Sequence, residues 1–216
     1  MSDVWVIVEQ LEGKLSEVTF ELLGRARELA LGGRVVVVLL GHGIKELTPE
    51  LGAADSVILV EDETLANYTP ESYRRVIAEL ARTRNPRLIM VANTSMGMDL
   101  AAGLSGELGM PLVAYCKDVK AEDGQVIAVS QLYGGKVWVE SILEGGKGLV
   151  SVLAGAFRAD AGKKAGTPQV ETVACPALGT PRIRFKSLLR PQTGDVDITK
   201  ENILVSVGRG IQSQDN

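Results

Sequence analysis

The chain has 216 residues, and its 23 Lys and Arg against 27 Asp and Glu give a formal net charge of −4. With 45% hydrophobic and 23% charged residues, the composition is that of one or two globular domains, which excludes a disordered tail and a polybasic nucleic-acid binder. Residues 1–12 contain acidic but no basic side chains, and no apolar run is long enough to cross a bilayer, so we expect a cytoplasmic protein.

Short apolar runs rich in β-branched residues recur through the first half of the chain, as is typical of strands buried on both faces of a parallel sheet. The predicted strands are residues 4–8, 34–40, 57–60, 88–92 and 111–119. Helical periodicity predicts three intervening helices, which are residues 16–31, a helix opening at Thr69-Pro70 with Thr69 as N-cap, and residues 99–108. This alternation predicts an α/β fold with an open, doubly wound, mainly parallel sheet.

The pattern changes after residue 119. Three strand-like runs, residues 126–133, 136–143 and 149–154, are separated by Gly-rich turns and predict antiparallel hairpins that either extend the same sheet or form a small flanking one. Residues 158–167 are predicted to form an exposed loop or linker.

Further strands are predicted at residues 169–174, 182–189 and 202–207. In the second of these, alternating basic residues give one face that is either solvated or a docking surface for an acidic partner; they are Arg182, Arg184 and Lys186.

The cysteines and the single histidine argue against metal binding and nucleophilic catalysis. Cys116 and Cys175 lie far apart without a CxxC motif, so we predict no metal site and interpret both as small apolar residues within strands. His42 lies in a Leu-Gly-His-Gly turn, and any Ser-His-Asp or Cys-His arrangement would depend on it alone. We therefore predict no catalytic residue in this chain.

A nucleotide on such a sheet would bind at the carboxyl ends of the strands, near a topological switch point. The loop after the first strand (EQLEGK) carries Glu9 and Glu12 and matches neither GxGxxG nor GxxxxGK[ST], so a pyrophosphate would meet carboxylates there. The turn around His42 is interpreted as a tight turn and not as a phosphate cradle.

The segment after the fourth strand is less ordinary, because polar residues and a glycine stand where a strand ends and a helix begins. Its candidate residues are Asn93, Thr94, Ser95, Gly97 and Asp99. Two interpretations stay open: helix capping by Thr94, Ser95 or Asp99, and contact with a ligand or a partner.

Near the C-terminus a β-branched run breaks into Gly208-Arg209-Gly210, which predicts the opening of a second βα unit. The glycines would let the backbone approach a ligand, and Arg209 would donate to a phosphate. Six residues follow Gly210, fewer than two helical turns at about 3.6 residues each, so the helix of this unit does not fit in the chain.

Four stretches carry a family resemblance. They are VWVIVEQLEGKLSEVTFELLGRARELA, TSMGMDLAAGLSGELGMPLVAYCKDV, QLYGGKVWVES and DITKENILVSVGRGIQSQDN. In order and spacing they resemble the N-terminal portion of electron-transfer flavoprotein alpha subunits. The resemblance implies an adenine-nucleotide-hydrolase-like α/β docking domain in residues 1–190, followed in residues 191–216 by a linker and the first strand of an FAD-binding domain.

The same resemblance implies an electron carrier subunit and not an enzyme. Family members use FAD to pass electrons from dehydrogenases, including those of fatty acid oxidation, to a membrane quinone reductase or another acceptor. They pair with a beta subunit that carries AMP, whereas the N-terminal domain of the alpha subunit binds none. Arg209, between Gly208 and Gly210, matches the position of the family's FAD-contacting arginine, so these three residues are the expected partial FAD site.

Two other hypotheses remain at this stage. One is a stand-alone adenine-nucleotide-binding protein of the same fold that uses residues 93–99. The other is a homodimer of the isolated chain, formed when an apolar docking face pairs with itself in the absence of the beta subunit.

Overall fold

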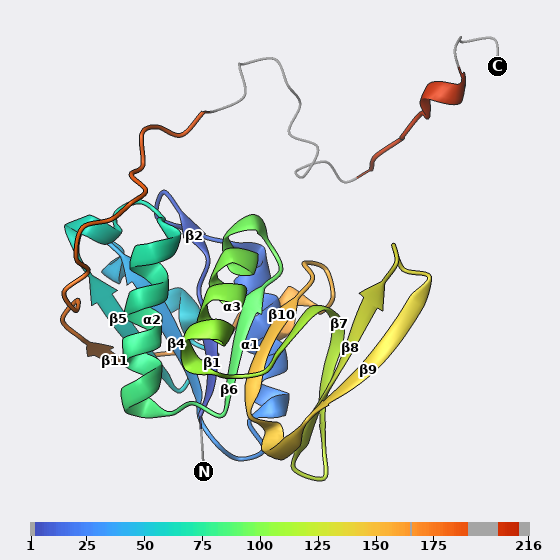
Figure 1. The fold of residues 1–216 in the computed structure, drawn as a ribbon, viewed down its shortest axis with the longest axis horizontal. Helices are drawn as coiled ribbons and strands as arrows, with labels where there is room; N and C mark the ends of the chain where they lie inside the picture. The colour runs from blue at the N-terminus through green and yellow to red at the C-terminus, as the bar shows by residue number, and fades with distance from the viewer. Residues whose placement is uncertain (1–2, 165, 190–202, 212–216) are drawn as a thin grey trace. The chain divides into compact units, whose positions relative to one another are not determined.

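The computed structural model describes residues 3–164, 166–189 and 203–211 (Figure 1). The chain divides into two units, residues 1–185 and 186–216, and each is described by itself. The main helices and strands, all in the first unit, are β1 (Val4–Ile7), β2 (Gln10–Leu11), β3 (Lys14–Leu15), α1 (Glu17–Leu29), β4 (Val35–Gly41), β5 (Ser56–Glu61), α2 (Pro70–Arg84), β6 (Leu88–Ala92), α3 (Ser95–Leu108), β7 (Leu112–Glu122), β8 (Gln125–Leu132), β9 (Val137–Leu143), β10 (Gly148–Val152) and β11 (Gln169–Thr172). Among the described residues, no helix combines the length and the apolar character that crossing a membrane requires.

A nine-stranded sheet in the order β11-β5-β4-β1-β6-β10-β7-β8-β9 forms the centre of the first unit. Every neighbouring pair from β11 to β7 is parallel, whereas β8 and β9 are antiparallel additions. Side chains of α1 pack on one face of the sheet and those of α2 and α3 on the other, which gives two apolar cores. The predicted doubly wound, mainly parallel α/β fold with antiparallel strands in its second half is therefore confirmed.

The helices form where the apolar spacing predicted them, with differences at their first residues. Thr69 is the N-cap residue of α2 and Pro70 its first residue, as predicted, although the Thr69 side chain accepts no capping hydrogen bond in the described structure. The third helix, α3, begins at Ser95 and not at Asp99, because the Thr94 hydroxyl accepts a hydrogen bond from the Gly97 N–H (3.0 Å) and caps the helix one turn earlier.

Strand β10 corrects the prediction of consecutive hairpins. It does not pair with β9 but lies between β6 and β7, parallel to both, and all five of its residues are buried. A continuous apolar run is typical of such a central parallel strand. The Gly145-Gly146 turn therefore does not close a hairpin: its two positive φ angles (62° and 66°) help return the chain to the middle of the sheet.

Strand β7 carries an irregularity at Tyr115, which has a positive φ of 57°. The pairing of β7 with both neighbouring strands is irregular near this residue. Its register with β10 shifts between Val150 and Val152, and its register with β8 shifts between Cys116 and Asp118. The strand bends here, and Figure 1 shows β8 and β9 continuing as a ribbon beyond the parallel strands. Cys116 is buried in β7 as predicted, whereas Cys175 is half-buried and lies outside any strand of the described chain.

The segment predicted as an exposed linker packs against α1 in part. Gly162 is buried against helix α1, where a Cβ atom would overlap the carbonyl oxygen of Phe20, and Lys163 pairs with Glu17 (2.6 Å). This connection brings the chain from β10, in the middle of the sheet, to β11, which is the edge strand next to β5. Residue 165 lies outside the described residues.

Two predicted C-terminal strands are wrong where the structure describes them. Residues 182–189 and 203–208 contain no strand, and all of them are exposed. A β-branched segment forms a strand only beside a neighbour that completes its backbone hydrogen bonds, and alternation alone does not supply that neighbour. Residues 190–202 lie outside the described residues, and Arg209–Ile211 form a short 3₁₀ turn.

Candidate functional site

The topological switch point of the sheet lies where β1 and β6 end side by side. The chain leaves β1 for α1 on one face and leaves β6 for α3 on the other face. In open α/β sheets this divergence creates the crevice in which nucleotides bind. The loops that border it are the residues after β1, including the small β2–β3 hairpin, and the residues after β6.

This crevice is bridged by a hydrogen bond between the two loops. The Thr94 hydroxyl donates to the Glu9 carboxylate (2.6 Å) while it accepts from the Gly97 N–H (3.0 Å). The Glu9 backbone is held in turn, because its carbonyl accepts from the Ser16 N–H (2.9 Å). A carboxylate thus stands at the helix N-terminus that would otherwise receive a phosphate, and its negative charge disfavours one there.

The remaining residues of this segment have mostly structural contacts. Asn93 donates its N–H to the Val152 carbonyl (2.6 Å), and its side-chain oxygen accepts from the Ser151 hydroxyl (2.6 Å), which ties the end of β6 to the end of β10. Gly97 touches β6 so closely that a Cβ atom would overlap the Ala92 carbonyl oxygen.

Ser95 lies exposed at the start of α3, and Asp99 lies exposed about one turn further along the helix. The capping interpretation thus holds for Thr94, and a partner contact through the exposed pair stays a prediction. Glu12 and His42 are also exposed, Glu12 in the turn between β2 and β3 and His42 in the turn after β4. Within the described chain no hydrogen bond joins His42 to a serine or cysteine.

Two tyrosines that sequence reasoning missed reinforce the same end of the sheet. The Tyr68 hydroxyl donates to the Met96 carbonyl (3.2 Å), and the Tyr73 hydroxyl donates to the carbonyls of Leu40 and Leu65 (3.3 and 3.0 Å). Burial raises the pKa of Tyr68 and raises that of Tyr73 to about 12, so both stay protonated donors at neutral pH. Their positions carry no motif, because neither Tyr68, just before α2, nor Tyr73, on the buried face of α2, reveals in the sequence which carbonyl it will reach.

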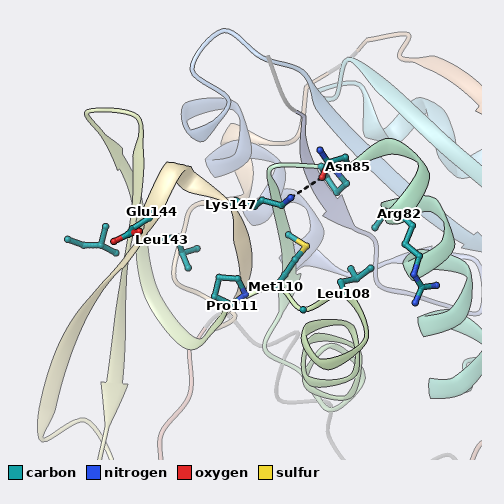
Figure 2. Close-up of a pocket in the computed structure, with 12 residues that line it drawn as sticks. Arg82, Asn85, Leu108, Met110, Pro111, Leu143, Glu144 and Lys147 are labelled. Atoms are coloured by element: carbon teal, nitrogen blue, oxygen red, sulfur yellow. Dashed lines mark hydrogen bonds between the residues drawn. The ribbon is translucent and has the colours of Figure 1, made fainter.

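A pocket of about 620 Å³ lies at the opposite end of the sheet, next to the first residues of β6, β7 and β10 (Figure 2). Met110 and Pro111 contribute to its apolar wall, and Lys147 donates to the Asn85 side-chain oxygen (3.0 Å) at its polar side. Arg82, also on its rim, is engaged by Glu107 (2.9 Å). None of the predicted site residues lines this pocket, and it is not at the carboxyl ends where a doubly wound sheet binds nucleotides.

The predicted FAD contact lies in the second unit. Gly208 precedes a 3₁₀ turn that contains Arg209 and Gly210, in which the Ile211 N–H donates to the Gly208 carbonyl (3.1 Å). A Cβ atom on either glycine would meet nothing within 4 Å, so the backbone of this turn leaves room for a ligand phosphate to approach. That these residues contact FAD stays a prediction.

These features define a doubly wound α/β domain that is built like a nucleotide-binding domain but whose crevice is bridged by its own side chains. Residues 4–178 match the electron transfer flavoprotein domain. The chain belongs to this family, which confirms the resemblance found in the sequence.

Three relatives show how the chain compares with known proteins. Protein FixB of Clostridium saccharobutylicum is 32% identical over 99% of this chain and 66% of its own length. The electron transfer flavoprotein subunit alpha of Clostridium acetobutylicum is 29% identical with the same coverage. The acryloyl-CoA reductase electron transfer subunit beta of Anaerotignum propionicum is 37% identical over 53% of this chain and 32% of its own length. The chain thus spans about two thirds of the length of the first two relatives.

Proposed function

We propose that this chain is the N-terminal part of an electron transfer flavoprotein alpha subunit, an electron carrier subunit that docks a beta subunit and has no catalytic residue of its own. The observation that carries the proposal is the similarity of the chain, over 99% of its length, to a protein with this name. The bridging of its nucleotide crevice by Glu9 and Thr94 agrees with it. A domain of this fold without a nucleotide is suited to holding a partner.

The proposed flavin contact lies in the second unit. Gly208, Arg209 and Gly210 would form one wall of the FAD site, with residues 191–216 as the linker and start of the FAD-binding domain and residues 1–190 as the docking domain. Bound FAD would accept and pass on electrons, while the protein supplies position and charge. The turn around Gly208 and Gly210 would bring backbone N–H groups to the ligand phosphate.

The wider setting follows from the same proposal. The beta subunit would carry AMP in its related domain, since the equivalent crevice here faces a phosphate with the carboxylate of Glu9. Electrons would come from dehydrogenases, such as those of fatty acid oxidation, and leave to a quinone reductase or a similar acceptor in a cytoplasmic setting.

The experiment is an absorption spectrum of the purified chain, recorded alone and after gel filtration with FAD and an electron transfer flavoprotein beta subunit from the same organism. Co-elution of the two proteins supports docking. A retained flavin band shows that the chain and the beta subunit together complete the FAD site; a colourless pair limits the chain to docking. Failure to co-elute at micromolar concentration contradicts the proposal, because a specific interface of about 1,600 Å² would hold under these conditions.

The same sample tests the stand-alone alternative. Titration of the isolated chain with AMP or ATP is expected to show no saturable binding. Binding that is lost in Ser95→Ala or Asp99→Ala would replace the carrier proposal with an adenine-nucleotide-binding function.

A further inference from the structure

The outer edge of the sheet at β9 is unpaired in the described part of the chain. β9 is seven residues long and bonds to β8 on one side, with no described strand on the other (Figure 1). Such an edge presents backbone N–H and C=O groups that another strand can use, and natural proteins usually shorten or cover it. The length of β9 and its exposure therefore suit the addition of a further strand at this edge.

The outward side chains of β9 define what kind of strand would fit. Trp138 is 55% exposed and Ile142 57% exposed, and both lie on the same face of the strand as Glu140, two residues from each. Their neighbours on β8 are Gln131, Ile127 and Val129. Glu140 is exposed, and no ion pair or hydrogen bond to it occurs among the residues that the structure describes. Lys120 on β7 attracts Glu140 electrostatically but forms its ion pair with Glu122 (3.0 Å). Along this face β9 thus presents an apolar, an acidic and an apolar side chain in turn.

A second copy of this chain is a poor match for that pattern. Antiparallel pairing centred on Glu140 sets Trp138 against Ile142 of the other copy, but it also sets the two Glu140 carboxylates directly opposite each other, which is destabilising. Centring the pair on Val139 or Ser141 instead places an apolar side chain against Glu140. The charge therefore disfavours self-pairing in each of these registers.

The chain's own C-terminal segment is no better match. Residues 203–207 (ILVSV) are exposed and β-branched, but they contain no basic side chain to meet Glu140. Residues 182–189 carry Arg182, Arg184 and Lys186 together on one face, so they do not match either. The pattern calls for a strand that carries a Lys or Arg between two apolar residues on one face.

We propose that β9 is the edge at which the beta subunit adds a strand to this sheet, with a basic side chain of that strand against Glu140 and apolar side chains against Trp138 and Ile142. Backbone hydrogen bonds would supply affinity, and Glu140 would select the partner strand and its register while opposing self-association. This inference rests on the proposed function, because it takes the beta subunit as the occupant.

Fluorine NMR of the chain labelled with 5-fluorotryptophan tests the inference directly, since the two tryptophans differ sharply in exposure. Trp138 is exposed, and Trp5 is fully buried and serves as the internal control. When unlabelled beta subunit is added, we expect the Trp138 resonance to shift and to lose its solvent isotope effect while the Trp5 resonance stays unchanged. A complex that forms with an unchanged Trp138 resonance overturns the inference.

Substitution of Glu140 provides the second test. We expect Glu140→Lys to raise the Kd for the beta subunit at least about tenfold, the size of a lost charge pair, and Glu140→Gln to raise it less. Glu46→Lys makes the same charge change on an exposed 3₁₀ helix elsewhere and is expected to leave the Kd unchanged. Equal weakening by both lysine variants overturns the inference, because the effect would then come from net charge.

Self-association gives a readout that does not need the beta subunit. We expect the unchanged chain to sediment as a monomer and Glu140→Val to form a dimer that Trp138→Glu abolishes. A Glu140→Val chain that remains monomeric overturns the role of Glu140 as a barrier to self-pairing. If the unchanged chain binds no beta subunit at all, the proposed function and the inference fall together; normal binding with no effect at β9 overturns the inference alone.

Discussion

The two edges of the sheet are finished in opposite ways. At β11 the edge strand is only four residues long and is tied to the body of the unit by Arg84, which pairs with Glu171 (2.6 Å). The chain beyond it lies along α2, where the Arg75 side chain donates to the Leu178 carbonyl (2.9 Å). At β9 the edge is longer and its central charge, Glu140, has no such contact in the described chain. Neither strand has a described strand on its outer side, but β11 is short and held to α2 by side-chain contacts, and we call it the closed edge. β9 is longer and has the pattern of an edge that pairs with a partner.

The connection that crosses α1 to reach β11 should be the most sensitive point of the closed edge. We expect Gly162→Val to lower the free energy of unfolding by about 3 kcal/mol or more, because its side chain would overlap the backbone of Phe20 and force the connection away. Urea unfolding followed by circular dichroism measures the effect. Gly106→Ala, at a helical position where a Cβ meets nothing within 4 Å, should instead stabilise by about 0.5–1 kcal/mol. Similar losses from both would show that Gly162 does not mark a tight crossing.

The start of the same connection depends on a buried carboxylate. Glu21 in α1 is 6% exposed and accepts hydrogen bonds from the N–H groups of Gly155 (2.9 and 3.0 Å) and Phe157 (3.3 Å). We expect Glu21→Gln to cost about 1–3 kcal/mol, since the amide is a weaker acceptor and brings an NH₂ group against two donors. Glu79→Gln on the exposed surface of α2 is the control and should change stability by less than about 0.5 kcal/mol. A neutral Glu21→Gln would mean that the loop is held by its other contacts.

The ion pair at the closed edge should contribute less, because it is partly solvated. A double-mutant cycle of Arg84→Ala and Glu171→Gln is expected to give a coupling energy of about 0.5–1 kcal/mol that shrinks in high salt. The half-buried thiol of Cys175, which follows β11, offers a local readout. Its reaction with a disulfide reagent should speed up in either variant. A change at Cys116 instead, where burial raises the pKa to about 11, would mean that the whole unit had loosened.

The smallest expected effect is a dependence on pH. The hydrogen bond from Arg84 lowers the pKa of Glu171 below its ordinary value of 4.5. A carboxyl whose pKa is lower in the folded state contributes stability above its unfolded pKa and loses that contribution as the pH falls through the folded pKa. The free energy of unfolding should therefore fall less steeply below pH 4.5 in Glu171→Gln than in the unchanged chain. Parallel curves for the two proteins would show that the pair adds nothing to folding.

Local sequence patterns were a good guide to the core elements and a poor guide to strand order. The buried faces of α1 and α2 and the strands β1, β4, β5 and β6 follow from apolar spacing, because each pattern is satisfied within a few residues. The run that became β10 looked like the third member of a hairpin series, since nothing local distinguishes a strand that pairs with its predecessor from one that inserts elsewhere. The bend at Tyr115 was also hidden, because a positive φ at a tyrosine has no sequence signal of the kind a glycine provides.

For the candidate site, too, some features follow from local sequence and others only from the tertiary structure. The sequence by itself determined that the loop after β1 is acidic and lacks a phosphate-binding motif, and that Thr94 stands at a helix start, because both follow from residue types and short spacings. Only the tertiary structure decided that Glu9 and Thr94 meet across the crevice, and that β11 and β9 are the two edge strands of the sheet in the described chain. Such contacts join residues far apart in the sequence, and the physical reason for them is the order in which parallel strands pack, which no local pattern encodes.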